Sequence, residues 1–300
     1  MVSTDRDPTL MKHVALLLLL AVIWSSSFTM IKVAVESVPP ITLVAARLAI
    51  AAIFLTLFLI IQGKRLPVLG RKWVPFFMVA FTGNSVPFFL ITWGEVGIDS
   101  GLAAILMAVM PLTTLVLAHF YTESDRITPV KFIGLSIGFI GVLVLVGPDL
   151  LSELGGHFIR EMAVAGAAIF YAITTVLIRR MPSGGDPIER SSGVMICAAM
   201  QMVPLSLIFD QPWTLDPTLT SMMANLYIGL FPTALAAIIH FHIVAERGTT
   251  FFTMINYIIP CMGVTWGAIF LAELVTWNMV LALVIILCGI AITNIKKRAI

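Results

Sequence analysis

Long apolar stretches, separated by short polar breaks, follow one another along almost the whole chain. Most extend over about 20 residues, the length that an α-helix needs to cross the hydrocarbon core of a bilayer. The breaks, such as "ESVPP" and "PSGGDP", hold the Gly, Pro, Asp and Ser that end helices and form turns. The pattern predicts ten transmembrane helices, over residues 13–34, 41–62, 73–93, 101–121, 130–147, 162–178, 191–209, 219–242, 250–271 and 277–294.

Composition agrees with this pattern. Apolar residues make up 59% of the 300 residues and charged residues 11%, and the mean hydropathy is +1.04. A soluble domain carries about 25% charged residues, and a water-soluble chain this apolar would expose aggregation-prone surface. We therefore predict an all-α integral membrane protein in contact with the lipid bilayer. The first segment is too long for a cleaved signal peptide, so we expect it to be retained.

Charge placement predicts the orientation of the helices. Fifteen of the eighteen Lys and Arg residues fall on the side that holds both termini, whereas Lys32 and Arg160 fall on the other side and Arg47 lies within a segment. Because cytoplasmic loops carry an excess of Lys and Arg, we predict that both termini are cytoplasmic and that residues 151–161 lie outside. The fifteen are Arg6, Lys12, Lys64, Arg65, Arg71, Lys72, Arg126, Lys131, Arg179, Arg180, Arg190, Arg247, Lys296, Lys297 and Arg298.

The two halves of the chain resemble each other. A shift of 147 residues aligns Trp24 with Tyr171 and Ser27 with Thr174. Each half holds five segments, an odd number, so the second half enters the membrane inverted relative to the first. We predict two inverted five-helix repeats, over residues 1–150 and 151–300. Inverted repeats are typical of secondary transporters, whose substrate site lies near the bilayer midplane between the repeats.

Four prolines lie near the middles of predicted helices, in two pairs related by the same repeat. A proline inside a helix removes one backbone hydrogen bond and kinks the helix, and in a membrane the freed carbonyl needs another partner. Each proline is either a packing kink or a hinge beside a central cavity. The paired occurrence favours hinges at Pro87, Pro111, Pro232 and Pro260.

Three stretches carry a resemblance to a known family. They are "WSSSF" in the first segment, "PLTTLVLAHFYTESDRITPVKFIGLSIGFIGVLVLVG" in the first half and "PCMGVTWGAIFLAELVTWNMVLALVIILCGIAI" in the second. Together they resemble the drug/metabolite transporter superfamily, and within it the ten-helix EamA-type exporters. The resemblance implies a secondary transporter of the bacterial inner membrane that exports amino acids, aromatic or other neutral ones, by alternating access. Export of another metabolite or drug class is the alternative, because fold does not determine substrate.

The serines of "WSSSF" point in three directions on a helix, so they cannot all face one cavity. Ser25 and Ser26 are interpreted mainly as packing residues. Ser27 shares a face with Trp24, and Thr174 shares one with Tyr171 in the same way. These two faces are candidate opposite walls of a substrate cavity. The competing interpretation is that both aromatic residues are ordinary core.

Further polar groups lie at mid-segment positions, where each needs a partner in a low-dielectric interior. Each is either a link between helices or a ligand for the substrate. Carboxamide and hydroxyl groups suit a zwitterionic amino acid, since they donate and accept hydrogen bonds without fixed charge. The candidates are Asn84, Tyr227 and Asn256.

Acidic residues fall in tails, loops or helix ends, with Glu95, Glu123 and Glu273 closest to a segment. Intramembrane carboxylates are the usual proton or cation sites, so their lack at mid-segment favours a facilitator or at most weak proton linkage. Arg47 can snorkel, pair with a loop carboxylate or attract a substrate carboxylate. His119, His240 and His242 lie toward the cytoplasmic ends of their helices, as capping groups or as part of a gate.

Other functional classes have less support. An intramembrane enzyme would need a nucleophile with a base, paired aspartates or a metal cluster, and the segments show none of these patterns; enzyme and channel are kept as weaker alternatives. Cys197, Cys261 and Cys288 lie within segments without metal-type spacing and are interpreted as buried thiols. We predict no cofactor, no metal, no nucleic-acid partner and a monomer.

Overall fold

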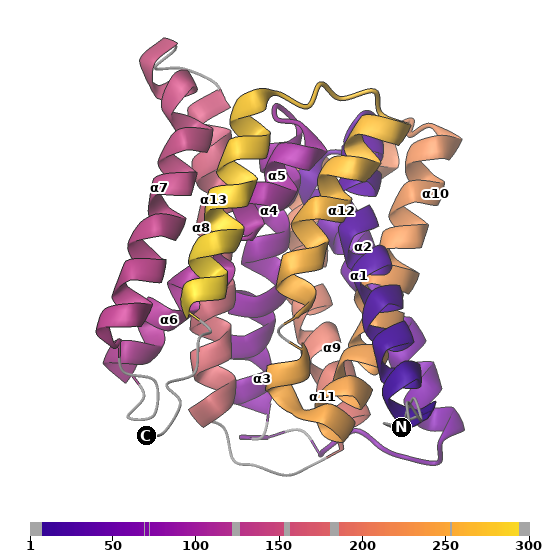
Figure 1. The fold of residues 1–300 in the computed structure, drawn as a ribbon. Helices are drawn as coiled ribbons and strands as arrows, with labels where there is room; N and C mark the ends of the chain where they lie inside the picture. The colour runs from indigo at the N-terminus through magenta and orange to yellow at the C-terminus, as the bar shows by residue number, and fades with distance from the viewer. Residues whose placement is uncertain are drawn as a thin grey trace.

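The computed structural model describes residues 8–68, 70–71, 73–121, 127–152, 157–180, 186–252 and 254–293. Every regular element within these ranges is a helix, which confirms the predicted all-α class. The long helices run side by side. The start of α1 and the end of α13 lie at the same end of the bundle (Figure 1). We call this the terminal end and the opposite one the far end.

The elements up to α7 belong to the first half of the chain. Two helix breaks interrupt them: a π-helical turn, η1, inside the third predicted segment, and a short gap between α5 and α6 inside the fourth. The bounds are α1 Pro8–Ala34, α2 Pro40–Ile61, α3 Trp73–Ala80, η1 Phe81–Ser85, α4 Val86–Glu95, α5 Ser100–Met107, α6 Met110–Tyr121 and α7 Pro129–Ser152.

The second half contains a corresponding π-helical stretch, η4, inside the eighth predicted segment. A second π-helical turn, η2, ends α9, and η3 is a short 3-10 helix. The bounds are α8 His157–Arg180, α9 Pro187–Leu205, η2 Ser206–Asp210, η3 Pro212–Thr214, α10 Leu219–Ile228, η4 Gly229–Leu235, α11 Ala236–Phe252, α12 Ile255–Phe270 and α13 Trp277–Thr293.

Seven helical stretches of the described residues are long and apolar enough to cross a membrane by length and composition, and three further apolar helices are shorter. The long stretches are Met11–Ala34, Pro40–Ile61, Trp73–Glu95, Ser100–Tyr121, His157–Ile178, Pro187–Asp210 and Leu219–Val244. The shorter ones are Pro129–Leu145, Ile255–Phe270 and Trp277–Thr293. All ten coincide with predicted segments, with boundaries displaced by a few residues.

The helices on either side of residues 153–156 extend further than predicted: α7 continues to Ser152 instead of ending at residue 147, and α8 begins at His157 instead of residue 162. Residues 153–156 lie outside the described residues, as does Glu123. "GP" at Gly147–Pro148 indicated a helix end, but near a membrane surface water can bind the carbonyl that a proline frees. At "AERG", the predicted break is a kink in α11, where Gly248 has a φ of 78°, a conformation that favours glycine.

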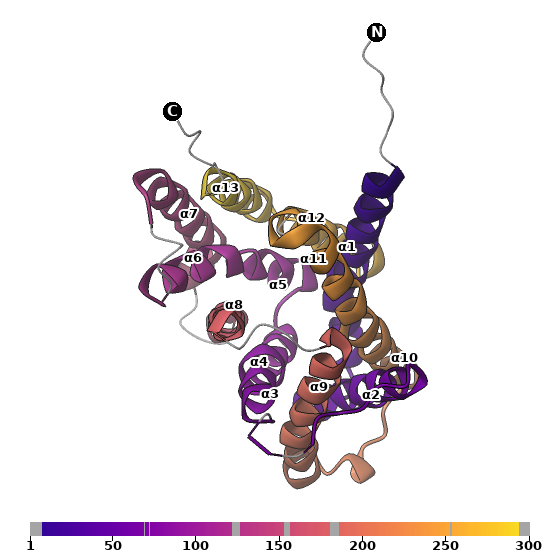
Figure 2. The same ribbon diagram turned by 90° about the horizontal axis from the view of Figure 1, so that it is seen from below.

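Helix packing follows a pattern that repeats between the halves. Across the two halves, α4 packs on α8, and α1 packs on α10 and η4. Likewise α1 packs on α12, and α8 packs on α5 and α6. Viewed from the terminal end, α7 and α13 lie at one edge of the bundle and α2 and α10 at the opposite edge, with α8 among α4, α5 and α6 (Figure 2).

Glycines hold α7 and α13 in close contact. A Cβ on Gly289 would lie 2.6 Å from the carbonyl oxygen of Gly134, and a Cβ on Gly134 would lie 2.7 Å from that of Gly289. Gly138 stands one turn after Gly134 and contacts the side chain of Leu112. Small residues spaced in this way let membrane helices approach until their backbones touch. The contact therefore depends on having no side chain at these positions.

Polar groups tie the two halves together at the far end. Lys32 donates to the carbonyls of Glu95 (2.9 Å) and Ile98 (2.8 Å), and Arg160 donates to that of Trp93 (2.7 Å). Both basic residues predicted on this side thus satisfy carbonyls at the C-terminus of α4, where cations are favoured. Capping of α4 therefore explains why Lys32 and Arg160 lie at the far end.

Glu273 satisfies the start of α5 at the same end. Its two carboxylate oxygens accept from the amides of Ser100 (2.7 Å) and Gly101 (2.9 Å). Asp99 occupies the N-cap position of α5 but makes no capping hydrogen bond with its side chain. Burial, and after it the nearby Glu273 carboxylate, raises the pKa of Asp99 above its ordinary value. A residue between α12 and α13 therefore caps a helix of the first half.

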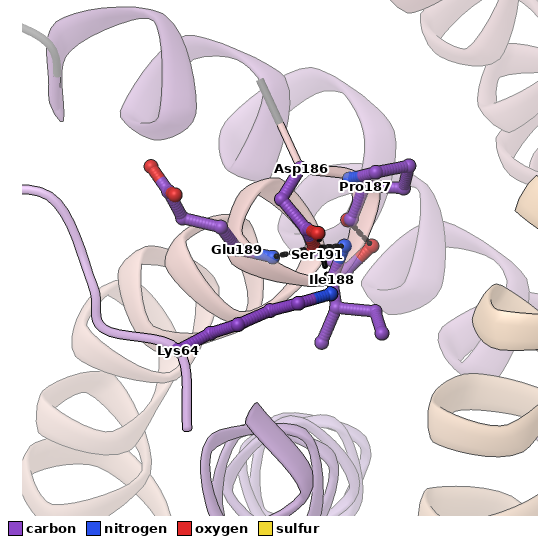
Figure 3. Close-up of polar contacts among 6 residues, drawn as sticks. All are labelled: Lys64, Asp186, Pro187, Ile188, Glu189 and Ser191. Atoms are coloured by element: carbon purple, nitrogen blue, oxygen red, sulfur yellow. Dashed lines mark hydrogen bonds and ion pairs between the residues drawn. The ribbon is translucent and has the colours of Figure 1, made fainter. Parts of the chain in front are cut away.

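At the terminal end a second carboxylate links the halves (Figure 3). Asp186 accepts from the amides of Ile188 (2.9 Å) and Glu189 (3.3 Å), which caps α9. Lys64, which follows α2, approaches the same carboxylate to 2.5 Å. Partial burial opposes ionisation, but the Lys64 hydrogen bond and the two amides together hold the pKa of Asp186 below its ordinary 3.8.

Gly289→Leu is expected to destabilise the protein by about 1–3 kcal/mol, because the new side chain overpacks the α7–α13 contact. Thermal unfolding in detergent measures this. Ala291→Leu, on an exposed face of α13, is the matched control and should leave the midpoint unchanged. Equal midpoints for both variants would show that the glycine contact does not contribute to stability.

Asp186→Ala should cost about 0.5–2 kcal/mol at neutral pH, as the loss of an N-cap does. Since folding lowers the pKa of this carboxyl, its contribution is complete above pH 3.8 and disappears as the pH falls through the lower folded value. Denaturation of wild type and variant between pH 7 and pH 3 should therefore converge at the acid end. Asp216→Ala, at an exposed position, is the control. A constant difference across this range would contradict the capping role.

Candidate functional site

A buried arginine lies on the inner side of α2. Arg47 is 5% exposed, and its guanidinium carbon stands 3.7 Å over the ring centre of Phe88 in α4. Its Nε donates to Thr233 Oγ1 of η4 at 2.7 Å. Gly229 allows this approach, because a Cβ there would lie 2.8 Å from Ile50 and 3.2 Å from the carbonyl oxygen of Arg47. Arg47 forms no ion pair with a carboxylate of the described residues.

The hydroxyl that binds Arg47, that of Thr233, lies directly after a proline in η4. Pro232 has no amide hydrogen to bond to the carbonyl of Ile228, four residues earlier. The Thr233 hydroxyl donates to that carbonyl at 2.9 Å and accepts from Arg47 Nε. A continuous chain of hydrogen bonds therefore runs from the guanidinium through the hydroxyl to the freed carbonyl. In the π-helix the amide of Thr233 also bonds to this carbonyl, so the backbone group is satisfied within the protein, as a membrane requires.

The corresponding π-helix of the first half, η1, carries Asn84 and is held by α9. Gln201 donates to the carbonyl of Phe77 (3.0 Å) and accepts from the Ser85 hydroxyl (2.6 Å). Asn84 is 8% exposed, and its carboxamide makes no hydrogen bond within the described part of the chain. π-Helical turns occur frequently at functional sites. Both halves thus place a π-helix next to interior polar groups.

Trp24 and Ser27 lie where α1 meets the second half. The Trp24 indole donates to the carbonyl of Pro232 at 3.1 Å and packs edge-on against His240 and Phe252. Ser27 is turned toward its own helix and donates to the Trp24 carbonyl at 2.6 Å. Trp24 therefore contacts η4, the stretch that also holds Thr233.

Tyr171 and Thr174 lie on α8, next to the first half. Thr174 donates to Thr82 Oγ1 at 2.8 Å and is close-packed on Gly83. The Tyr171 hydroxyl makes no hydrogen bond with the described residues, and it interacts electrostatically with Arg47. Tyr171 packs in a different hydrophobic cluster from Trp24. The structure thus places Trp24 against η4, which sequence alone did not indicate.

Tyr227 bonds to a serine that the sequence assigned to packing: its hydroxyl lies 2.9 Å from Ser26 Oγ. Ser25 accepts from the Trp266 indole at 2.8 Å. The three serines of "WSSSF" thus have three different surroundings. Asn256 lies in the first turn of α12, partly exposed and without a side-chain hydrogen bond to the described residues.

The four candidate hinges differ in geometry. Pro232 lies within η4, and Pro87 follows η1 directly in the first turn of α4. Pro111 is the second residue of α6, after the gap at Ala108–Val109, whereas Pro260 lies inside the continuous helix α12. Each member of the first pair is thus associated with a π-helix of its own half, whereas the second pair shows no such common feature.

Glu95 is at a helix end, as predicted, but it is also fully buried. Both of its carboxyl oxygens lack a hydrogen-bond partner among the described residues. Lys32, Glu273 and Arg47 act on it electrostatically. Sequence position does not reveal this burial, because a helix end can be covered by its neighbours. Glu95 is therefore the acidic residue of most interest for transport.

Two further features lie outside this interior. A pocket of about 420 Å³ at the terminal end is lined by Lys12, His13, His242, Glu246 and Arg247. The prediction of buried thiols is correct for Cys197 but wrong for Cys261 and Cys288, which are exposed because they lie on the outer faces of α12 and α13. Among the described residues, no group of three metal-binding side chains occurs.

The long apolar helices, with polar groups between the two halves, define the class of a multi-pass membrane protein with a polar interior. The particular family follows from comparison: residues 11–147 and again 159–295 match the EamA-like transporter family. The chain therefore belongs to this family and contains its unit twice, which confirms the resemblance to the drug/metabolite transporter superfamily.

Several relatives cover almost the whole chain. The uncharacterized transporter YoaV of Bacillus subtilis is 25% identical over 89% of this chain and 91% of its own length. An uncharacterized transporter of Archaeoglobus fulgidus is 29% identical over 96% and 100%. The uncharacterized inner membrane transporter YedA of Escherichia coli is 25% identical over 93% and 89%. A solved crystal structure aligns with a TM-score of 0.66 at 18% identity over 94% of this chain and 97% of its own, which shows a shared fold.

Proposed function

We propose that this protein is a secondary transporter that exports neutral amino acids across the bacterial inner membrane by alternating access. The family unit present in both halves carries the proposal. We further propose that the seven long and three shorter apolar helices form ten crossings. The repeats would comprise residues 1–150 and 151–300, the second inverted. Transport in sealed vesicles, rather than catalysis that persists in detergent, separates this proposal from an intramembrane enzyme.

The packing pattern supports an inverted repeat. If each segment is exchanged for the one five places away, the contact of α4 with α8 becomes that of α1 with α10, η4 and α11. The contact of α1 with α12 becomes that of α8 with α5 and α6, and the contacts of α2 with α9 and α7 with α13 map onto themselves. A two-fold relation between the halves produces such an exchange.

The chemistry of the interior supports a zwitterionic substrate. Asn84, Tyr171, Tyr227 and Asn256 offer donors and acceptors, and Trp24 offers an apolar surface beside η4. Ser27 and Thr174 would line the same path from the repeat-related helices α1 and α8. Such a site binds a small polar backbone and tolerates varied apolar side chains. We propose that Pro87, Pro111, Pro232 and Pro260 act as hinges, and that one chain suffices for transport.

Both termini are proposed to be cytoplasmic, which places the terminal end inside and the far end outside. In a variant without the three native cysteines, a cysteine at Ser152 should react with a membrane-impermeant maleimide added from outside to intact cells. A cysteine at Arg65, on the terminal side, is the control and should react only after the membrane is opened. The reverse pattern would invert the topology.

Trp24→Ala should weaken counterflow of phenylalanine and leucine in proteoliposomes more than that of alanine, since an aromatic contact contributes on the order of 0.5–1.5 kcal/mol. Trp24→Phe should retain most of the selectivity because it keeps a ring although it loses the bond to Pro232. Leu18→Ala, on the exposed face of α1, is the control. Equal losses for all substrates, following protein abundance, would show that Trp24 is structural.

The same vesicles test whether transport is coupled to a proton gradient. Without a carboxylate at mid-span, we expect counterflow without a pH gradient and little accumulation with one. Accumulation driven by the gradient and abolished by Glu95→Gln would show that the buried Glu95 carries the proton.

A further inference from the structure

The guanidinium of Arg47 has unused donors. Arginine presents five N–H groups, of which only Nε–H is bonded within the described part of the chain. The two terminal nitrogens are not fully enclosed by protein atoms. In this they differ from the carboxyl oxygens of Glu95, which are fully enclosed and also unpaired. The terminal nitrogens therefore border space that water can reach. The remaining donors of Arg47 face this space.

The arginine is held in one orientation. Phe88 lies against one face of the guanidinium, and Thr233 binds its Nε edge. Such stacking and edge contact leave the terminal nitrogens in a fixed fork, the geometry that pairs with a carboxylate through two parallel hydrogen bonds. A merely structural arginine in a membrane normally pairs with a protein carboxylate or with carbonyls. Neither kind of partner occupies the fork among the described residues.

The surroundings also favour an anion. Tyr171 and Glu95 both act on Arg47 electrostatically, and neither side chain makes a hydrogen bond with the described residues. Of these, the neutral hydroxyl can donate to a bound carboxylate, whereas Glu95 acts on Arg47 without forming an ion pair. A buried cation without a protein counter-ion gains most from a ligand that brings one, because the interior dielectric is low.

We propose that Arg47 binds the carboxylate of the transported molecule, with Phe88 and Thr233 as positioning residues and Tyr171 as a second donor. This inference rests on the proposed transport function and specifies its substrate as a molecule with a free carboxylate. Arg47 lies on α2 of the first half and Thr233 on η4 of the second. Binding at the fork therefore connects substrate recognition to the contact between the halves.

The test compares three ligands that differ at one end: phenylalanine, phenylalaninamide and 3-phenylpropanoate. Binding to the purified protein is measured by calorimetry. The wild type should bind both carboxylates at least about tenfold more tightly than the amide, as expected for hydrogen bonds to a charged group. Arg47→Gln should remove this preference, and Arg47→Lys should retain part of it. Arg65→Gln, which removes an exposed arginine, should leave it intact.

The ratio of carboxylate to amide affinity is the decisive quantity, since a structural role of Arg47 would lower both affinities together. Wild-type binding of the amide as tight as that of the acids, or an unchanged ratio in Arg47→Gln, would overturn the inference, as would no binding of either carboxylate. If Arg47→Gln does not fold, the wild type and Arg47→Lys still give the ratio. If the protein carries out counterflow of amino acids but binds phenylalaninamide as tightly as the two carboxylates, this inference alone is refuted and the proposed transport function stands. Binding of 3-phenylpropanoate through Arg47 without counterflow of any amino acid would instead refute the proposed substrate class.

Discussion

The rest of the interior depends on the requirement that a polar group inside a membrane must find its partner within the protein. Pro232 frees the carbonyl of Ile228, the Thr233 hydroxyl binds that carbonyl, and Arg47 binds the hydroxyl. Without the Thr233 hydroxyl, the Nε–H of a buried cation would lack a partner. The π-helical geometry of η4 and the close approach at Gly229 bring α2 and η4 near enough for this contact.

Satisfaction of backbone groups also explains how the halves meet at the two ends of the bundle. At the far end Glu273 and Arg160, from the second half, cap α5 and α4 of the first, and Lys32 of the first half adds a further bond to α4. At the terminal end Asp186 caps α9 and binds Lys64 from the other half. The proposed alternation between two openings would require the halves to separate at one end at a time. Contacts of this kind, made by a few charged groups at helix ends, can be exchanged at far lower cost than the glycine-packed seam of α7 and α13.

Much of the fold could be predicted from the chain alone. Apolar length locates ten helical stretches, and Pro87 and Pro232 correctly indicate that the third and eighth segments are interrupted. The sequence does not distinguish a kink from a π-helix, however, because the outcome depends on which neighbour supplies the missing hydrogen bond. Nor does it reveal that α7 passes through Pro148, or that Ser26 bonds to Tyr227. Helical spacing gives the direction of a side chain but not what lies opposite.

By itself, the sequence determined the all-helical membrane class, the family and the duplication, since each depends on local apolar length or on residue order along one chain. Only the tertiary structure decided which interior groups remain unpaired. The sequence leaves three possible roles for Arg47. The packing of α2 against α4 and η4 narrows them, because it supplies Phe88 and Thr233 and, among the described residues, no carboxylate that pairs with the arginine. Glu95 likewise changes from a helix-end residue to a fully buried one. Burial and pairing are properties of residues distant in sequence, so they become defined only when the helices pack.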